Sequence, residues 1–304
     1  MFDITVVGHF SLDFIFLPDK LIPYAVLGGS ATYVSFAAKR LDAAVSVVSK
    51  VGGDFPEAYL QRLKGEGIDL SAVAKVDDAK STSFELIYDK SLSSRVLRLK
   101  SRAPPLTVED LPRNLRTKVV HIAPIAGEVT FELFEKLRGC AEILSFDPQG
   151  LVRIFDGNGN VTYGPLRNKE VFGLVDVYKS SLDEVKAATG FSDLHLAVKA
   201  IHDYGVKVAI VTLGAKGAVL STENVVHKIM VYKSNRVVDP TGAGDAFIGG
   251  FLAEYLREKD PIWCACVGSA IASLAIESVG PTFPCGKKEI YRRAHLLYGK
   301  GIKE

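Results

Sequence analysis

The chain has 304 residues, of which 48% are hydrophobic, so it is long enough to bury a large core in one α/β domain or in two smaller ones. Its 37 basic and 35 acidic residues give a net charge of +2 without long runs of one sign, which argues against a nucleic-acid-binding surface or a polybasic membrane anchor. An acid stands at position 3, where a signal peptide would need bases, and no apolar run approaches the roughly 18 residues of a membrane span, so we expect a cytoplasmic protein.

The cysteines and histidines do not have the spacing of a metal site. The four cysteines form no Cys-x-x-Cys pair, and Cys264 and Cys266 lie in an apolar stretch with helical spacing, so buried thiols are expected. His121 lies within an apolar strand pattern and reads as a core residue with satisfied hydrogen bonds. His195 and His202 fall in a predicted helix.

An apolar strand pattern over residues 4–7 opens the chain and ends at a glycine. Asp13 follows between two apolar residues. Because open α/β sheets hold ligands beyond the carboxyl ends of their strands, Asp13 is a candidate ligand-binding carboxylate, and the capping of a turn is the alternative.

A glycine pair, Gly28 and Gly29, leads into an amphipathic helix pattern over residues 30–41. Without Cβ atoms these two positions let the main chain approach a ligand closely. A strand pattern over residues 45–51 then runs into Gly52, and a helix ending near residue 65 follows. We expect Asp54 to cap that helix.

Residues 81–100 carry no helix signal and read as a β-hairpin with one apolar face. Together with residues 10–27 they predict a small separate sheet. Such a sheet exposes an apolar face or edge unless something covers it, so we expect a homodimer through this sheet.

From residue 119 onward, strand and helix patterns alternate. Strands over 119–124 and 142–147 flank a helix over 129–138, and another strand covers 175–179. Polar and glycine residues follow several of the strand patterns; they are Gln149, Arg153, Ser181, Glu184, Thr212, Gly214 and Gly217.

The most informative stretch is Pro-Thr-Gly-Ala-Gly-Asp at 240–245, followed by apolar residues at helical spacing. It predicts a helix that opens at about Asp245, with free N–H groups at Gly242, Ala243 and Gly244 that suit a phosphate. A carboxylate at a phosphate site is explained if it accepts a hydroxyl proton during phosphoryl transfer. The alternative is an ordinary strand-to-helix turn capped by an Asp.

This stretch resembles the C-terminal signature of the ribokinase-like (PfkB) carbohydrate kinases, Asp-Thr-Thr-Gly-Ala-Gly-Asp, and differs from it by Pro240. The other landmarks of the family fall in the same order and cover nearly the whole chain. The resemblance implies an α/β fold with a doubly wound, mainly parallel sheet flanked by helices. It implies one kinase domain over residues 1–304, with a small β-sheet lid inserted from 10–27 and 81–100.

The resemblance also implies a role for each candidate residue. Asp245 would be the general base, and Gly242, Ala243 and Gly244 would form the anion hole. Substrate contacts are expected from Asp13, Gly28, Gly29, Tyr33, Gly52, Gln149 and Arg153. Nucleotide contacts are expected from Ser181, Thr212, Gly214, Gly217, Thr241, Gly242 and Gly244. Glu184 would hold Mg²⁺ indirectly through water. The implied cofactors are ATP and Mg²⁺, and a monovalent cation is a further candidate.

Two departures from the family pattern bear on the acceptor. Tyr33 and Ser181 stand where the family keeps asparagines, and Tyr33 makes a ribose-type pocket a poor expectation. With Phe-Asp-Pro-Gln-Gly-Leu-Val-Arg at 146–153, the pattern resembles the myo-inositol kinase branch. We therefore expect an ATP-dependent kinase that phosphorylates a sugar or cyclic polyol, with myo-inositol as the best candidate.

Two alternatives stay open. A nucleoside kinase or a ribose or ketose kinase of the same family would need aromatic residues for base stacking or a different sugar pocket. The aromatic candidates in the lid region are Phe10, Phe14, Phe16 and Phe84. A sugar- or nucleotide-binding sensor without catalysis is the alternative from another class, and a retained Asp245 argues against it.

Overall fold

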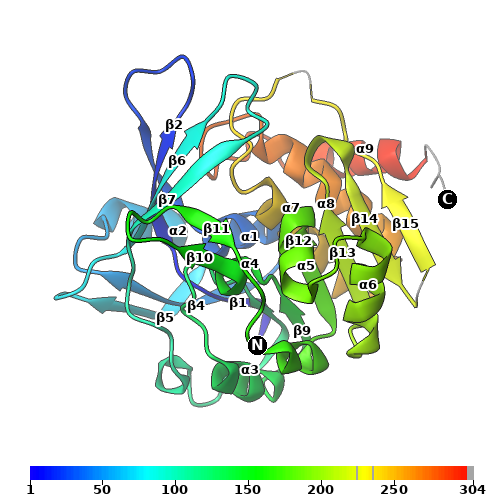
Figure 1. Ribbon diagram of the computed structural model, residues 1–304, viewed down its shortest axis with the longest axis horizontal. Helices are drawn as coiled ribbons and strands as arrows, with labels where there is room; N and C mark the ends of the chain where they lie inside the picture. The colour runs from blue at the N-terminus through cyan, green and yellow to red at the C-terminus, as the bar shows by residue number, and fades with distance from the viewer. Residues whose placement is uncertain (224, 235, 300–304) are drawn as a thin grey trace.

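The computed structural model describes residues 1–223, 225–234 and 236–299 (Figure 1). The strands are β1 (Phe2–Val7), β2 (Ser11–Phe16), β3 (Tyr24–Gly28), β4 (Val45–Gly52), β5 (Asp69–Val76), β6 (Thr82–Tyr88), β7 (Arg95–Ser101), β8 (Thr117–Ile122), β9 (Ala141–Phe146), β10 (Arg153–Phe155), β11 (Val161–Tyr163), β12 (Val177–Ser181), β13 (Val208–Thr212), β14 (Ala218–Thr222) and β15 (Val225–Ile229). The helices are α1 (Ser30–Lys39), α2 (Glu57–Gly65), α3 (Phe131–Arg138), α4 (Gln149–Val152), α5 (Leu182–Thr189), α6 (Leu194–Asp203), α7 (Ala243–Tyr255), α8 (Pro261–Ala275) and α9 (Lys287–Tyr298).

The large sheet has nine strands in the order β15-β14-β13-β12-β9-β8-β1-β4-β5. All neighbours from β13 through β5 run parallel, and β14 and β15 complete the sheet as antiparallel strands. The chain builds outward from β1 in one direction through β4 and β5, and in the other through β8, β9 and β12. This confirms the doubly wound, mainly parallel sheet and places its switch point beside β1, where such sheets hold ligands.

Side chains alternate between the two faces along each strand, so the large sheet has an apolar core on each face. Ile4 and Val6 of β1 pack in the cluster that contains residues of α1, α7, α8 and α9. Val7 points to the other face and packs in the cluster with residues of α3, α5 and α6. The period of two in a strand thus explains how helices cover both faces.

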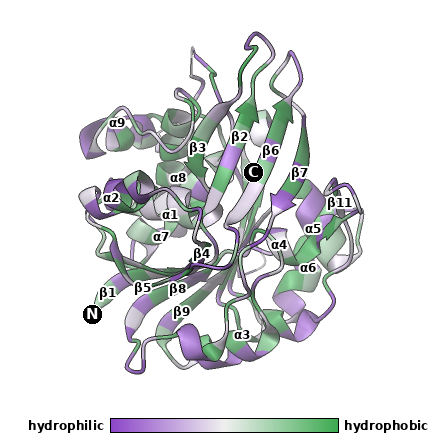
Figure 2. Ribbon diagram, turned by 90° about the vertical axis from the view of Figure 1, so that its left-hand side faces the viewer, coloured by the Kyte–Doolittle hydropathy of each residue, from purple (hydrophilic) through white to green (hydrophobic). Residues whose placement is uncertain are grey.

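A second sheet, β3-β2-β6-β7, forms the lid and projects from the large sheet at the top of Figure 2. Its central pair β2 and β6 runs parallel, and the outer pairs are antiparallel hairpins. Its apolar face packs through Phe84 and Leu86 on Ile125 and Ala126, which follow β8. The lid is therefore anchored at the carboxyl end of the large sheet, and the expected small β-sheet lid is confirmed.

One local expectation was met within two residues, and another was wrong. Helix α7 begins at Ala243, two residues before Asp245, because Gly242 adopts φ 73° and already turns the chain into the helix. Asp54 does not cap α2, whose N-cap position is Pro56. Its carboxylate instead accepts a hydrogen bond from the Ser81 N–H (2.7 Å) and so fixes the chain where it enters β6.

The buried thiols were expected correctly, since Cys264 and Cys266 lie in the core of α8. His121 is buried too, but only its Nδ1 has a partner, the Ser145 hydroxyl (2.9 Å), and Nε2 has none. Burial lowers the pKa of His121 to about 3, so the ring is neutral. Within the described ranges, no three His, Cys, Asp or Glu residues are grouped so that they could hold a metal ion, and no helix is long and apolar enough to cross a membrane.

Candidate active site

Helix α7 presents its N-terminus to the space beneath the lid, with Asp245 in its first turn. The glycines of this turn are explained by neighbours within the protein. A Cβ on Gly242 would lie 2.2 Å from the Tyr33 ring, and one on Gly244 would lie 3.0 Å from the Lys179 Nζ. The sequence predicted that the N–H groups of this turn suit a phosphate; the space beside the Cα atoms of Gly242 and Gly244 holds Tyr33 and Lys179.

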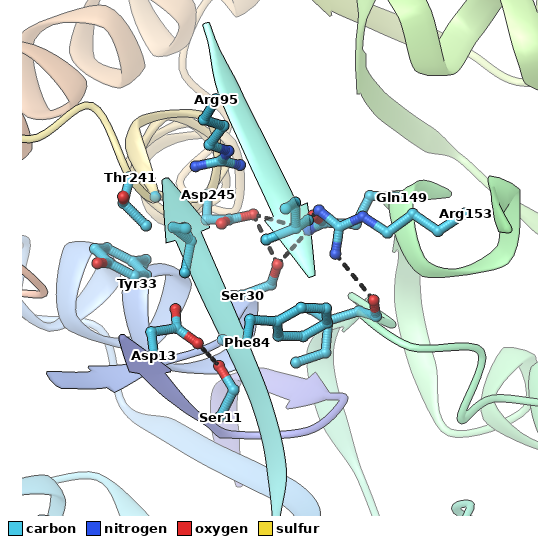
Figure 3. A pocket seen from close by; sticks show the side chains of 15 residues that line it. Ser11, Asp13, Ser30, Tyr33, Phe84, Arg95, Gln149, Arg153, Thr241 and Asp245 are labelled. Carbon is cyan, nitrogen blue, oxygen red and sulfur yellow. Dashed lines mark hydrogen bonds between the residues drawn. The ribbon is translucent and has the colours of Figure 1, made fainter. Parts of the chain in front are cut away.

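Asp245 is held by a short hydrogen-bond network (Figure 3). Its Oδ1 accepts from the Ser30 hydroxyl (2.9 Å) and from the Gln149 amide (3.4 Å), and this amide also donates to the Ser30 hydroxyl. The Gln149 carbonyl accepts from Arg153 (2.5 Å), so both polar ends of Gln149 are engaged. Oδ2 of Asp245 is therefore the oxygen left for a ligand.

Asp13 lies across the same pocket, on strand β2 of the lid sheet. Its side chain accepts from the Ser11 hydroxyl (2.6 Å), and the residue is only 5% exposed. Burial raises the pKa of Asp13 to about 6. A Cβ at Gly28 would lie 2.1 Å from this carboxylate, so Gly28 is required to accommodate Asp13 and does not itself line the pocket.

Tyr33 reaches the pocket from helix α1 and is 1% exposed. Its hydroxyl is buried without a hydrogen-bond partner, and burial raises the pKa of Tyr33 well above its ordinary value. Figure 3 shows the ring between Asp13 and Thr241. An unpaired buried hydroxyl at a pocket wall is a group that a ligand can satisfy.

Residues of the lid close the pocket from above; they are Phe84, Leu86, Arg95 and Leu97. Arg95 donates to the Tyr88 hydroxyl (2.8 Å), which is hydrogen-bonded to the Thr241 hydroxyl (2.8 Å). The lid is thus connected to the turn that precedes α7. Sequence reasoning missed Arg95, because an arginine in a hairpin reads as a solvated charge.

The pocket is open to solvent and has an empty volume of about 380 Å³, which includes open solvent at its mouth. Eight of the expected residues line it: Asp13, Gly29, Tyr33, Gln149, Arg153, Thr241, Gly242 and Asp245. Gly52 does not, because it packs against the backbone of residues 79–81. Ser11 and Ser30 were not foreseen, since a single serine has no distinctive sequence signal.

Of the residues expected to contact a nucleotide, Thr241 and Gly242 line this pocket. The others lie outside it; they are Ser181, Thr212, Gly214, Gly217 and Gly244. Ser181 and Glu184 form a capping box at the start of α5, in which the Glu184 Oε2 accepts from the Ser181 N–H (2.7 Å). Thr212 ends β13, and Gly214, with φ 58°, is exposed beyond it. The other oxygen of Glu184, Oε1, accepts no hydrogen bond from the described residues. Because Mg²⁺ keeps most of its hydration shell, a single carboxylate oxygen of this kind suits an ion held through water.

A buried ion pair lies between the residues that line the pocket and the residues expected to contact a nucleotide. Lys179, in the middle of β12, pairs with Asp147, which follows β9 (2.5 Å), and their side chains are 6% and 0% exposed. Asp147 also accepts from the Gln149 N–H (3.0 Å). No sequence pattern singles out this lysine, because it ends an apolar strand pattern.

Comparison with known proteins agrees with this architecture. A model of the pfkB family of carbohydrate kinases matches residues 1–288. A cytidine kinase of Thermococcus kodakarensis is 30% identical over 270 residues, 88% of this chain and 94% of that protein. A nucleoside kinase of Methanocaldococcus jannaschii is 30% identical over 91% of both chains, and an inositol 3-kinase of Arabidopsis thaliana is 25% identical over 91% of this chain and 74% of that protein.

Solved structures share the fold. A pyrophosphate-dependent kinase of the ribokinase family, complexed with a pyrophosphate analogue and myo-inositol, superposes with a TM-score of 0.80 at 24% identity, covering 95% of this chain and 99% of that one. A pyrophosphate-dependent myo-inositol-1 kinase, converted into a myo-inositol-3 kinase by two substitutions to leucine, gives 0.78 at 24% identity, covering 96% and 98%. The chain belongs to the pfkB family of carbohydrate kinases and is a phosphotransferase whose acceptor is a hydroxyl group.

Proposed function

We propose that the chain transfers the γ-phosphoryl group of ATP, with Mg²⁺, to a hydroxyl of a cyclic polyol, and that myo-inositol is this acceptor. The observation that carries the proposal is that Asp13 and Asp245, far apart in sequence, line one pocket beneath an apolar lid. A cyclohexane polyol has hydroxyls around its rim and weakly polar C–H faces. The carboxylates of Asp13 and Asp245 can bind the hydroxyls. Leu86 and Leu97 of the lid can pack on a C–H face.

The geometry suggests how the residues would act. Asp13 and the Tyr33 hydroxyl bind neighbouring hydroxyls and direct another toward Asp245. As the hydroxyl oxygen attacks the γ-phosphorus, Oδ2 of Asp245 takes its proton, the bond between the γ-phosphorus and its bridging oxygen breaks, and ADP leaves. Ser30 and Gln149 hold Oδ1 and so fix the orientation of the base. The N-terminus of α7 stabilises the transferring phosphoryl group.

Bound Mg²⁺ would neutralise phosphate charge, and Glu184 would hold it through water. The nucleotide would lie on the same side of the site as Glu184, and it would be bordered by Ser181, Thr212, Gly214 and Gly217. Their place at the carboxyl ends of β12 and β13 and in the turn after β13 supports this assignment.

A nucleoside is the second candidate acceptor, because two relatives with 30% identity are a cytidine kinase and a nucleoside kinase. Of the four aromatic residues considered for base stacking, only Phe84 lines the pocket. The guanidinium of Arg153 lies over its ring, 5.7 Å from the centroid. A base would have to displace this cation, which favours the polyol.

The lid also suggests which hydroxyl reacts. In the myo-inositol-1 kinase that became a 3-kinase, an asparagine and a serine eleven positions apart were replaced by leucine. Leu86 and Leu97 of this chain are eleven positions apart, pair directly across the lid hairpin and both line the pocket. We propose that they orient myo-inositol so that its 3-hydroxyl faces Asp245. The variant Leu86→Asn/Leu97→Ser should shift the product toward the 1-phosphate, as resolved by chiral chromatography.

The decisive experiment is an assay of phosphoryl transfer over a panel of acceptors and donors. We expect the highest kcat/KM with myo-inositol, compared with ribose, fructose 6-phosphate, cytidine and adenosine. ATP and pyrophosphate are compared as donors, with and without Mg²⁺ and with K⁺ or Na⁺. A higher kcat/KM with a nucleoside or ribose would overturn the myo-inositol assignment, and transfer from pyrophosphate alone would overturn the assignment of ATP.

We also propose a homodimer through the lid. Leu21 and Ile22, in the loop between β2 and β3, are 103% and 79% exposed, and Phe14 of β2 is 37% exposed. A pair of lids would cover this apolar surface. Light scattering should give the mass of a dimer, and of a monomer for Leu21→Ser/Ile22→Ser. A monomeric parent protein would contradict the proposal.

A further inference from the structure

We propose that Lys179 is a fixed cation of the phosphate site, which lies beneath the N-terminal turn of α7 and stabilises the phosphoryl group during transfer. This inference rests on the proposed kinase function and assigns a role to a buried charge that the mechanism above leaves unused. The Nζ of Lys179 lies so close to the turn that a Cβ on Gly244 would be only 3.0 Å from it. A glycine at position 244 is therefore what allows the ammonium to lie directly against the anion-binding turn.

The lysine is charged in spite of its burial. Burial acts to lower the pKa of Lys179, but the charges of three neighbouring carboxylates outweigh this effect and raise the pKa above its ordinary value. These carboxylates belong to Asp147, Asp245 and Glu184. With such neighbours the charged ammonium form of Lys179 is favoured.

The charge balance shows why a phosphate site would need this cation. A phosphoryl group that enters between Asp245 and Glu184 meets negative charge on both sides, and Asp147 lies behind them. Lys179 interacts with all three carboxylates, so its removal would leave the incoming anion facing three negative charges without this cation. Charges fixed before the reaction stabilise a transition state without reorganisation, and they act strongly where water is excluded.

Asp147 is the positioning residue for this lysine. It holds Nζ through one oxygen and accepts the Gln149 N–H through the other. Because the Gln149 side chain contacts Asp245, the same carboxylate orients groups on both the donor and the acceptor side of the transfer. The alternative role of the pair is purely structural, since a buried ion pair also fixes how β12 and β9 pack.

Three variants separate these roles: Lys179→Met, Asp147→Asn, and the double variant that combines both substitutions. Lys179→Met leaves Asp147 buried without a partner and lowers the melting temperature. The double variant removes both charges and should regain most of that loss. Asp147→Asn keeps the charge of Lys179 and an acceptor for the Gln149 N–H.

The measurements are kcat, KM for the donor, and the affinity for inorganic pyrophosphate with Mg²⁺, by calorimetry without acceptor. A role in the phosphate site predicts that kcat falls by about 10²–10³ in both variants that lack Lys179, that pyrophosphate binds about tenfold more weakly, and that the KM for the acceptor stays within threefold. Asp147→Asn should retain most of the pyrophosphate affinity. A purely structural role predicts the reverse, with both single variants damaged and kcat restored in the double variant.

The binding experiment does not depend on knowing the acceptor. If the parent protein phosphorylates nothing on the panel, the proposed function fails, but the comparison of pyrophosphate affinities still decides the role of Lys179. Equal pyrophosphate affinity in the parent and in the double variant, or no measurable pyrophosphate binding by the parent, would overturn the proposal.

Discussion

The regions that we propose as the acceptor side and the donor side of this kinase are built differently. The pocket proposed for the acceptor is formed by side chains from β2, α1, β6, β7, α4 and the turn before α7, and several of its polar side chains are buried, among them Asp13, Gln149 and Thr241. The donor-side residues lie at strand ends, in a capping box and in an exposed glycine turn. A pocket made by many segments is specific to one acceptor, whereas turns and helix N-termini suit any phosphate. Specificity is therefore expected on the lid side and general phosphoryl chemistry on the other.

The strongest test of this comparison removes the group on which both sides converge. Asp245→Asn should lower kcat by 10² or more, because the loss of a general base costs about 10²–10⁴, while the affinity for the nucleotide changes little. Asp203→Asn, an exposed residue at the end of α6, is the matched control and should leave kcat unchanged. Steady-state kinetics and nucleotide calorimetry on both variants are the measurements. Unchanged kcat in Asp245→Asn would remove this residue from the mechanism.

The acceptor side alone is tested at Asp13. Asp13→Asn should lower kcat/KM for the acceptor by about 10–100-fold, since a buried hydroxyl that loses its partner costs about 1–3 kcal/mol. Because the pKa of Asp13 is raised to about 6, kcat/KM for the acceptor should also fall in the parent protein below pH 6, as Asp13 becomes protonated. The variant should lack this decline. An identical acidic decline in both proteins would assign it to another group.

The buried carboxylate of Asp13 should also lower the free energy of unfolding at neutral pH. Its pKa rises from 3.8 to about 6 on folding, so the folded protein binds the proton more tightly than the unfolded chain. The free energy of unfolding therefore decreases as pH rises from 4 to 6, and at pH 7 the cost is at most about 3 kcal/mol. Asp13→Asn should raise the melting temperature at pH 7.5 and change it little at pH 4.

The same contrast explains what could be predicted from the sequence. The large sheet follows from apolar strand patterns that alternate with helix patterns, and the lid from a hairpin without a helix. The Gly-Ala-Gly-Asp turn is a local motif, so Asp245 and the start of α7 were found within two residues. Arg95, Ser11 and Ser30 were missed because only the packing of lid on sheet brings them into the pocket. Lys179 was missed because its ion-pair partner, Asp147, is 32 residues away in the sequence.

A smaller effect is expected on the donor side, at Glu184. Glu184→Gln should raise the Mg²⁺ concentration required for half-maximal activity by about tenfold, the lower end of the effect of groups that hold a metal indirectly. The neutral side chain can still accept the Ser181 N–H, so α5 keeps its cap. Asp183→Asn, an exposed neighbour in the same turn, controls for a general change of charge. Metal titrations that coincide for all three proteins would contradict the assignment of Glu184.

The smallest effect is predicted at Tyr33, and it has opposite signs for stability and for binding. The Tyr33 hydroxyl is buried without a partner, so Tyr33→Phe should raise the free energy of unfolding by about 1 kcal/mol in the absence of acceptor. If the acceptor satisfies this hydroxyl, the same variant should lose about fivefold in kcat/KM for myo-inositol. Tyr178→Phe is a matched control, because the Tyr178 hydroxyl is also buried and unpaired but lies in the core beneath α5 and α6, outside the pocket. It should raise stability without any change in kcat/KM, whereas equal catalytic losses in the two variants would show that Tyr33 makes no specific contact with the acceptor.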